Sequence, residues 1–301
     1  MFRIADARPL GPNVTQFTIE APRIARKQLP GQFVILRLDE RGERIPLTIK
    51  GSDPQRGTIT LVVQAVGKTT AQMSELKTGD AILDVVGPLG KASSIEHLGT
   101  VIVVGGGVGT AIALPIAEAL RKAGNRVFSI LGARTKELLI LEDEVRAVSD
   151  QLFIMTDDGS YGTKGLVTDK LRQLVQLPVN LVLAIGPVPM MRAVAEVTRE
   201  RRIRTVVSLN SIMVDGTGMC GGCRVIVDGK SEFACVDGPE FDAHRVDFQV
   251  LSQRNAMYRE QEQQAFAMWK ERCASHGVED RQSCLSGQAG LPVLHGKGLH
   301  A

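Results

Sequence analysis

The sequence has few aromatic side chains, no long apolar run and almost no imbalance of charge. Phenylalanine, tyrosine and tryptophan make up 4% of the 301 residues, too few to build a stacking platform for nucleic acid bases. The 36 basic and 33 acidic side chains leave a formal charge of +3, which argues against a basic nucleic acid-binding surface. No uninterrupted apolar stretch approaches the about 20 residues of a membrane helix. We therefore expect neither a nucleic acid partner nor a membrane.

Cysteine is also scarce, and its placement is informative. The first ten residues lack the basic start and long apolar stretch of a signal peptide, which predicts a cytoplasmic protein with reduced thiols. Three of the five cysteines lie within 16 residues of each other, at Cys220, Cys223 and Cys235. The other two, Cys273 and Cys284, lie in the C-terminal tail. An odd cluster of three in a reducing compartment needs an explanation other than disulfides.

The N-terminal part of the chain is typical of a small antiparallel β-barrel. Short β-rich runs alternate there with turns that contain glycine, proline and aspartate. The expected strands are 14–19, 33–38, 47–50, 58–66 and 81–86.

The sequence pattern changes at residue 99, where strand-like and helix-like segments begin to alternate. This pattern predicts a doubly wound parallel α/β sheet. The expected strands are 100–104, 126–131, 152–156, 181–185 and 205–208, and the expected helices are 110–123, 136–148, 163–174 and 188–202.

After residue 208 the periodicity fails and glycine, cysteine and aspartate dominate, as in a segment organised by something other than a core. A polar helical pattern over 250–272 and a Ser-, Gly- and His-rich end follow. The predicted division is a β-barrel at 1–98, an α/β domain at 99–208, a cysteine-containing module at 209–250, and a helical tail with a mobile end at 251–301.

The most specific motif places Asp215, Cys220, Cys223 and Cys235 at spacings of x4, x2 and x11. This matches the plant-type iron–sulfur spacing, with Asp in place of the first Cys. The glycines of the loop let its backbone curl tightly and point N–H groups at sulfur. Aspartate keeps the negative charge of a thiolate but offers a harder oxygen ligand. Three cysteines and an aspartate can also hold zinc, although zinc sites more often pair two Cys-x2-Cys units.

A further motif is typical of phosphate and nucleotide sites. The run Gly105-Gly-Gly-Val-Gly109-Thr110 joins a buried strand to a helix, so that a pyrophosphate could approach backbone amides and the helix N-terminus. No acidic residue ends the second strand, where Gly132-Ala-Arg134 stands instead, and a tight turn without a ligand remains an alternative.

Weaker motifs lie in the barrel. An arginine and a hydroxyl on one strand, as in Arg44-Ile-Pro-Leu-Thr48, can hold the phosphate and ring of a flavin. The turn Gly67-Lys-Thr-Thr70 can hold phosphate through its amides. An exposed arginine and a solvated turn explain the same residues.

Together these motifs resemble the flavin-dependent ferredoxin reductase superfamily. Within it, the sequence is similar to the branch with the electron-transfer subunit of dihydroorotate dehydrogenase, and most similar to the small (alpha) subunits of NADH-dependent reduced ferredoxin:NADP oxidoreductase, also known as sulfide dehydrogenase. The resemblance extends from residue 1 to about residue 270. Beyond the motifs above it rests on segments 87–90, 156–162, 186–191 and 208–223. The departures are Ser211, where relatives often have proline, and the tail after Arg272.

The resemblance implies a ligand for each motif, while NAD(H) and NADP(H) both stay open. The residues implied to contact FAD are Arg44, Pro46, Leu47 and Thr48, with Gly67, Lys68, Thr69 and Thr70 near its diphosphate. Those implied to face the nicotinamide nucleotide are Gly105, Gly107, Gly109, Thr110, Gly132, Arg134, Asp157, Gly186 and Pro187. The implied ligands of a [2Fe–2S] cluster are Asp215, Cys220, Cys223 and Cys235.

The implied function is electron transfer between NAD(H), FAD, the cluster and a partner protein. The partner would be a larger NADPH-binding flavoprotein with [4Fe–4S] clusters, and the heterodimer would exchange electrons with ferredoxin by electron bifurcation. No catalytic acid or base is expected, because the cofactors supply the chemistry. The alternatives are the electron-transfer subunit of a dihydroorotate dehydrogenase and a non-catalytic zinc-stabilised or redox-sensing interaction module.

Overall fold

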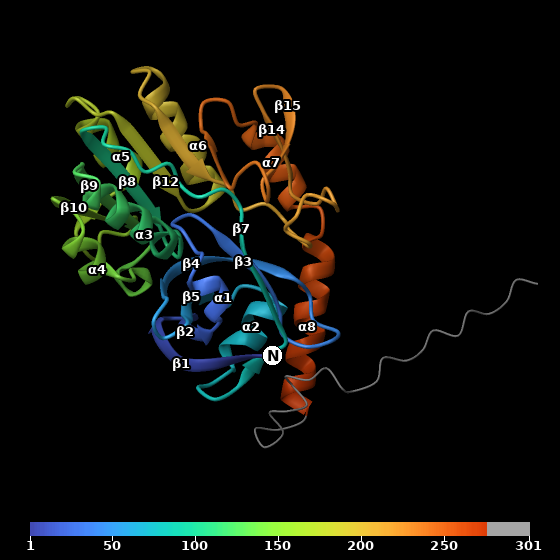
Figure 1. Cartoon of the computed structure of the whole chain (residues 1–301). Coiled ribbons are helices and arrows are strands. Elements are labelled where there is room, and N and C mark those ends of the chain that lie inside the picture. Colours follow the sequence, from blue (N-terminus) through green and yellow to red (C-terminus); the bar gives the residue numbers. More distant parts are fainter. Residues whose placement is uncertain (276–301) are drawn as a thin grey trace, which may run out of the picture.

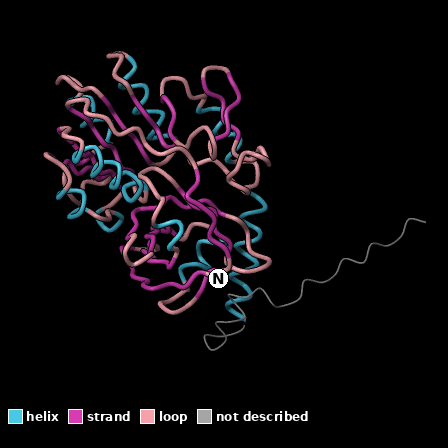
Figure 2. Tube along the Cα trace, viewed as in Figure 1, coloured by secondary structure: helices cyan, strands magenta, loops and turns pink. Residues whose placement is uncertain are grey.

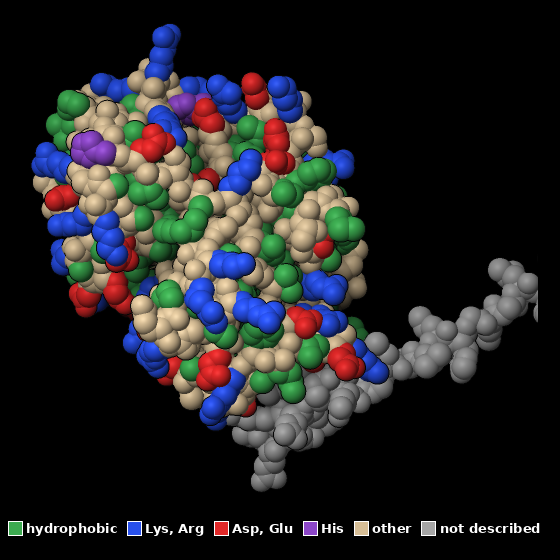
Figure 3. Space-filling model, in the orientation of Figure 1, with side chains coloured by type: hydrophobic (Ala, Val, Ile, Leu, Met, Phe, Trp, Pro, Cys, Tyr) green, Lys and Arg blue, Asp and Glu red, His purple; other side chains and the backbone are tan. Residues whose placement is uncertain are grey.

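The computed structural model describes residues 1–275, which form two lobes, each built around a seven-stranded sheet (Figure 1). The expected positions in the tail beyond residue 275, including Cys284, lie outside the described residues. No helix among residues 1–275 is both long enough and apolar enough to cross a membrane. On the face shown in Figure 3, basic and acidic side chains are interspersed, as the small formal charge would lead one to expect.

The N-terminal sheet is antiparallel throughout and has the order β6-β1-β2-β5-β4-β3-β7. Its strands are β1 (Phe2–Gly11), β2 (Val14–Glu20), β3 (Phe33–Arg37), β4 (Ile45–Asp53), β5 (Thr58–Gln64), β6 (Ala81–Ile82) and β7 (Asp84–Leu89). Two short helices, α1 (Pro22–Ala25) and α2 (Lys68–Ser74), accompany it. The sheet curls into a half-barrel whose edge strands are β6 and β7, which confirms the expected antiparallel β domain.

The second sheet has the order β11-β10-β9-β8-β12-β13-β16 and is parallel except at β16. Its strands are β8 (Thr100–Gly106), β9 (Arg126–Ala133), β10 (Gln151–Thr156), β11 (Thr163–Lys164), β12 (Leu181–Ile185), β13 (Thr205–Ser208) and β16 (Glu240–Asp242). The first strand, β8, is central, and the strand order reverses between β8 and β12. This is the doubly wound arrangement, with a topological switch point beside β8.

Helices cover both faces of this sheet (Figure 2). They are α3 (Gly109–Lys122), α4 (Glu142–Ala147), α5 (Val167–Leu174) and α6 (Val188–Arg199). Val101 and Val103 of β8 pack with α3, whereas Ile102 and Val104 belong to the core shared with α5 and α6. This alternation is what a strand buried on both faces requires.

Two expected helices begin later than their sequence pattern predicts. Residues 136–148 form a 3-10 turn, η1 (Lys136–Leu138), and then α4, because Ile140 and Leu141 are buried in a cluster with Val14 and Val62 of the first lobe. Residues 163–174 begin as β11, and Gly165, with a φ of 132°, separates that strand from α5. In both cases tertiary packing or a left-handed glycine overrides local helix propensity.

The segment after β13 has more regular structure than its composition suggests. The hairpin of β14 (Arg224–Val227) and β15 (Lys230–Phe233) precedes β16, which pairs with β13. The expected helix over 250–272 is in fact two helices, α7 (Phe248–Asn255) and α8 (Arg259–Ser275). From the end of α7, α8 runs back along the first lobe beside α2 (Figure 1). The domain boundaries at residues 98, 208 and 250 stay predictions, and the β13–β16 pairing crosses the second of them.

Candidate functional site

The cysteine-containing loop is held in shape by its own backbone. Gly216, Gly218 and Gly221 have φ values of 75°, 86° and 66°, the left-handed region that glycine alone enters readily. Asp215 closes the loop, since its carboxylate accepts hydrogen bonds from the N–H groups of Thr217 at 3.0 Å and Cys220 at 2.9 Å. These bonds, chiefly the one from Thr217, hold the pKa of Asp215 below its usual range.

The structure brings two of the four expected cluster ligands into contact. The Sγ atoms of Cys223 and Cys235 are 3.1 Å apart as free thiols, and both residues are buried. Burial, followed by the hydrogen bond and charge of Cys223, raises the pKa of Cys235 to about 12. Cys220 is exposed at the mouth of the loop, and its Sγ accepts from the N–H of Gly222 at 3.4 Å.

This donor set fits a metal cluster, although the four ligands do not converge. Among residues 1–275, no three histidine, cysteine or acidic side chains lie close enough together to hold a metal ion. Nevertheless, three sulfur donors and a carboxylate lie on one tight loop and its neighbouring turn, and thiols of raised pKa are deprotonated when they bind metal. The assignment of Asp215, Cys220, Cys223 and Cys235 as ligands stays a prediction.

The loop packs directly on the half-barrel. A Cβ atom added to Gly216 would lie 2.6 Å from Cδ1 of Leu89 on β7 and 2.9 Å from Cγ1 of Ile35 on β3. Phe33 and Ile35 share one hydrophobic core with Cys223 and Cys235. The loop is therefore built against β3 and β7.

The expected flavin residues occupy the strand next to β3. In the β3–β4 pair, Ile35 lies opposite Pro46 and Phe33 opposite Thr48, so all four share one face of the sheet. Leu47 lies on the other face and packs into the barrel core. Arg44 is exposed just before β4 and has no hydrogen bond or ion pair within residues 1–275.

The Gly67–Thr70 turn lies next to the start of β4 because Glu43 connects them. Glu43 pairs with Lys68 Nζ at 3.6 Å and accepts a hydrogen bond from the hydroxyl of Thr69. The Thr70 Oγ1 accepts from the N–H groups of Val66 and Gly67, each at 3.0 Å. The two weak motifs thus form one surface, and Glu43, adjacent to Arg44, is a member that the motifs alone did not indicate.

The expected nucleotide-binding residues gather at the carboxyl edge of the parallel sheet. Gly105 is the next-to-last residue of β8, and Gly132 and Arg134 lie at the end of β9. Asp157 and the Gly186–Pro187 turn follow β10 and β12. Arg134, Asp157 and Pro187 are exposed there. Ligands of doubly wound sheets bind at this edge, at the switch point.

The glycines at the switch point allow two loops to approach closely. A Cβ on Gly186 would lie 3.1 Å from Cα of Gly106. Gly107 has a φ of 55°, and nothing lies within 4 Å of where its Cβ would be. We call this open space beside Gly107 the open cradle. Thr110 is 3% exposed and faces Gly105, so its side chain points away from that cradle.

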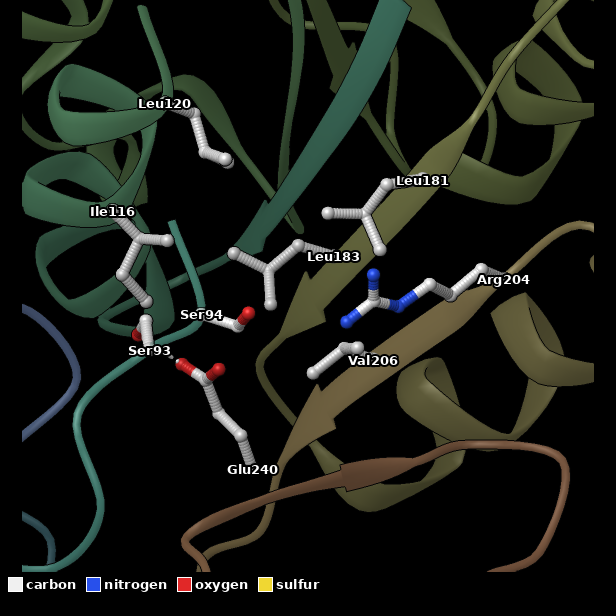
Figure 4. A pocket seen from close by; sticks show the side chains of 9 residues that line it. All are labelled: Ser93, Ser94, Ile116, Leu120, Leu181, Leu183, Arg204, Val206 and Glu240. Carbon is white, nitrogen blue, oxygen red and sulfur yellow. Dashed lines mark hydrogen bonds between the residues drawn. The ribbon is translucent and has the colours of Figure 1, made fainter. Parts of the chain in front are cut away.

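A small hollow lies away from this edge, between β12, β13, α3 and Glu240 (Figure 4). Its volume is about 20 Å³, room for a single water molecule. The Ser93 hydroxyl donates to the carboxylate of Glu240, and burial raises the pKa of that carboxyl. The hollow is lined by the second lobe and by Ser93 and Ser94 of the segment that connects the two lobes.

The raised pKa gives a prediction for stability. The folded protein binds a proton on Glu240 more tightly than the unfolded chain, so this stabilisation is complete below about pH 4.3, the usual glutamate value. It is lost as the pH rises through the folded-state pKa. We expect Glu240→Gln, which stays neutral, to be more stable than the parent at pH 7 to 8 by roughly 1 kcal/mol, and no more stable at pH 4. Thermal unfolding of both proteins across this pH range checks the prediction. Glu200→Gln, at an exposed position, is the control. Equal or lower stability of Glu240→Gln than of the parent at pH 8 would contradict the prediction.

Comparison with known proteins agrees with this arrangement. Residues 2–93 match the oxidoreductase FAD-binding domain family, and residues 210–247 match the iron–sulfur cluster binding domain of dihydroorotate dehydrogenase B. A homologue of the dihydroorotate dehydrogenase B (NAD(+)) electron transfer subunit from Thermotoga maritima is 52% identical over 251 residues, 83% of this chain and 89% of that protein. The electron transfer subunit from Bacillus caldolyticus is 34% identical over 252 residues, 81% of this chain and 96% of that protein.

A solved structure supports the same relationship. A chain from the structure of NADH-dependent reduced ferredoxin-NADP oxidoreductase, described for its insights into flavin-based electron bifurcation, superposes with a TM-score of 0.85 at 48% identity. The match covers 90% of this chain and 98% of that one. The chain therefore belongs to the family of electron-transfer subunits with FAD-binding and iron–sulfur domains that includes the electron transfer subunit of dihydroorotate dehydrogenase B.

Proposed function

We propose that this subunit carries electrons between NAD(H) and a larger flavoprotein through FAD and a [2Fe–2S] cluster. The observation that carries the proposal is the contact between the cluster loop and the flavin strand. Gly216, next to Asp215, packs on Ile35, and Ile35 lies directly opposite Pro46 of the expected flavin site. Opposite residues of an antiparallel pair have Cβ atoms about 5 Å apart, which supports neighbouring positions for the two proposed cofactor sites.

The bound cofactors would supply two-electron exchange with a nicotinamide and one-electron exchange with a partner. The role of the chain is to hold them. Arg44 and Lys68 offer positive charge to a diphosphate, and the N-terminus of α2 offers amides. Pro46 and Thr48 present one face of β4 to the ring. At the opposite lobe, the open cradle over Gly107 suits a nucleotide pyrophosphate. The x4, x2, x11 spacing supports a two-iron cluster over other cluster types.

The surroundings of the cluster loop support a protein partner. Met219 is 89% exposed beside the exposed Cys220, and Val214 and Val236 are also exposed on this segment. Apolar side chains gathered at a redox site are typical of a docking surface. We propose that the larger subunit covers these exposed apolar side chains, and that it binds NADPH and [4Fe–4S] clusters. The heterodimer would work in the cytoplasm as an electron-bifurcating NADH-dependent reduced ferredoxin:NADP oxidoreductase. The 48% identity to a chain of that enzyme supports this assignment.

A second candidate is the electron-transfer subunit of a dihydroorotate dehydrogenase. The 52% identity to the Thermotoga maritima homologue favours it, whereas Asp215 in place of a cysteine ligand argues for the first candidate. The two differ in the partner that co-purifies with the chain. A partner that reduces the complex with dihydroorotate supports the second candidate, and one that reduces it with NADPH supports the first.

An anaerobic absorbance titration of the purified chain with NADH tests the proposal. We expect the flavin band to bleach and the broader iron–sulfur absorbance to fall in part, with about two iron and two sulfide per chain. A colourless protein that contains zinc would instead support a non-catalytic interaction module. A flavin that NADPH reduces and NADH does not would overturn the proposed nucleotide.

A further inference from the structure

One arginine outside all of these motifs contacts the cluster loop. Arg254 lies near the end of α7, a helix fixed at its start by Asp247, whose carboxylate accepts from the N–H groups of Gln249 and Val250. Phe248 and Leu251 are buried in the same core as Cys223 and Cys235. The helix therefore presents Arg254 from a rigid support.

The contact is made at the centre of the ligand motif. The Nη2 of Arg254 donates to the carbonyl oxygen of Gly222 at 3.2 Å. Gly222 lies between Cys220 and Cys223, and its own N–H donates to the Sγ of Cys220 at 3.4 Å. The guanidinium thus contacts a residue that is adjacent to Cys223 and two positions from Cys220.

The neighbouring residue fixes the start of the same segment. The Nδ2 of Asn255 donates to the carbonyl oxygen of Asn210 at 3.1 Å. Three buried polar atoms lie on these joined segments without a hydrogen-bond partner in the described structure: Ser211 Oγ, Arg254 Nε and Asn255 Oδ1. The end of α7 is therefore a polar surface built around the cluster segment, not a solvated helix end.

Arg254 carries a charge with no other counterpart. No carboxylate lies within 4.0 Å of its guanidinium in the part of the chain that the structure describes. Arginine stays protonated in proteins, and a partly buried charge is retained where something of opposite sign faces it. The expected ligands of the loop become anionic when they hold a cluster, and Arg254 contacts that loop through the carbonyl of Gly222.

We propose that Arg254 raises the reduction potential of the cluster by placing a fixed positive charge beside its ligand loop. Reduction adds one negative charge to the cluster, so a nearby cation stabilises the reduced form more than the oxidised form. The hydrogen bond to Gly222 holds the charge in place. This inference rests on the proposed function, because it requires that the loop holds a redox cluster.

The test is a redox titration of the cluster, followed by electron paramagnetic resonance, in variants of the full chain. Arg254→Gln removes the charge but keeps a hydrogen-bond donor, and Arg254→Lys keeps the charge. Arg259→Gln, at an exposed position at the start of α8, removes the same charge from the same region and is the control. We expect Arg254→Gln to lower the equilibrium constant for cluster reduction at least tenfold, which is 59 mV for one electron. Arg254→Lys should change it less than threefold, and Arg259→Gln and the flavin potential should not change.

Other outcomes overturn the inference. An unchanged potential in Arg254→Gln, or an equal fall in Arg254→Gln and Arg254→Lys, would show that the charge has no role. If Arg254→Gln does not assemble the cluster, Asn255→Asp decides the matter, since it places a negative charge beside the same segment. A lowered potential in Asn255→Asp supports the inference, and an unchanged one contradicts it. A parent protein without iron would instead refute the proposed function.

Discussion

Replacing Cys235 by serine is expected to remove the iron–sulfur absorbance of the purified chain and leave FAD bound. Cys235 is buried against Cys223, with 3.1 Å between their sulfur atoms, so the variant loses one of the two expected ligands that are in contact. Serine is nearly isosteric, and a buried hydroxyl costs only about 1–3 kcal/mol when it lacks a partner. The expected result is nearly complete loss of cluster iron and sulfide with stoichiometric flavin, measured by metal analysis and absorbance.

The matched control is Cys273→Ser, which changes a cysteine on α8 outside the expected ligand set and should keep full cluster content. Retention of the cluster in Cys235→Ser would remove Cys235 from that set. Loss of FAD together with the cluster would mean that the shared core of Phe33, Ile35, Cys223 and Cys235 holds the flavin domain together.

The role of Asp215 can be separated in the same series. Its Oδ1 accepts from the N–H of Thr217 and its Oδ2 from the N–H of Cys220, and asparagine keeps only one of these two acceptor oxygens. We therefore expect Asp215→Asn to keep the bond from Thr217 and to lose the bond from Cys220. If Asp215 is a ligand, this variant loses the cluster or shifts its potential, and an unchanged spectrum and titration would leave Asp215 as a loop cap only.

Much of this architecture could be predicted from the sequence because the patterns are local. The strands at 181–185 and 205–208 have the expected bounds, since continuous β-branched and aliphatic runs between turns specify buried parallel strands. The glycine-rich turn at Gly105 and the carboxyl-edge positions follow from strand–turn–helix order alone. The spacing of Asp215, Cys220, Cys223 and Cys235 indicated the cluster module, which the match over 210–247 confirms as an iron–sulfur domain.

What could not be predicted depends on contacts between distant segments. Glu43 contacts Lys68 and Thr69 only because β4 and α2 meet in the half-barrel. Arg254 belongs to no motif, and its role depends on where α7 ends relative to Gly222. The cluster segment has no visible periodicity because its core is shared with β3, so its few apolar residues are completed by Phe33 and Ile35.

Gly216→Ala is expected to slow electron transfer from flavin to cluster, because Gly216 makes the contact between the cluster loop and β3. Its φ of 75° is unfavourable for alanine, and the added Cβ would lie 2.6 Å from Leu89 and 2.9 Å from Ile35. Distances below about 3 Å between carbon atoms cannot be accommodated without movement. The terminal methyl group of Leu89 can rotate aside, whereas Cγ1 of Ile35 lies nearer the backbone of β3, so we expect part of the movement to fall on the loop. Electron transfer slows as the distance between the two redox centres increases.

We expect stopped-flow reduction by NADH to show an unchanged flavin phase and a cluster phase that is slower than in the parent. Gly229→Ala is the matched control, because Gly229 has a φ of 72° and nothing within 4 Å of its Cβ position. It imposes the same backbone strain on the β14–β15 turn without moving the loop. Equal rates for the cluster phase in Gly216→Ala and the parent would show that electrons do not cross at the Gly216–Ile35 contact, and the path from flavin to cluster would then have to leave the half-barrel at another strand.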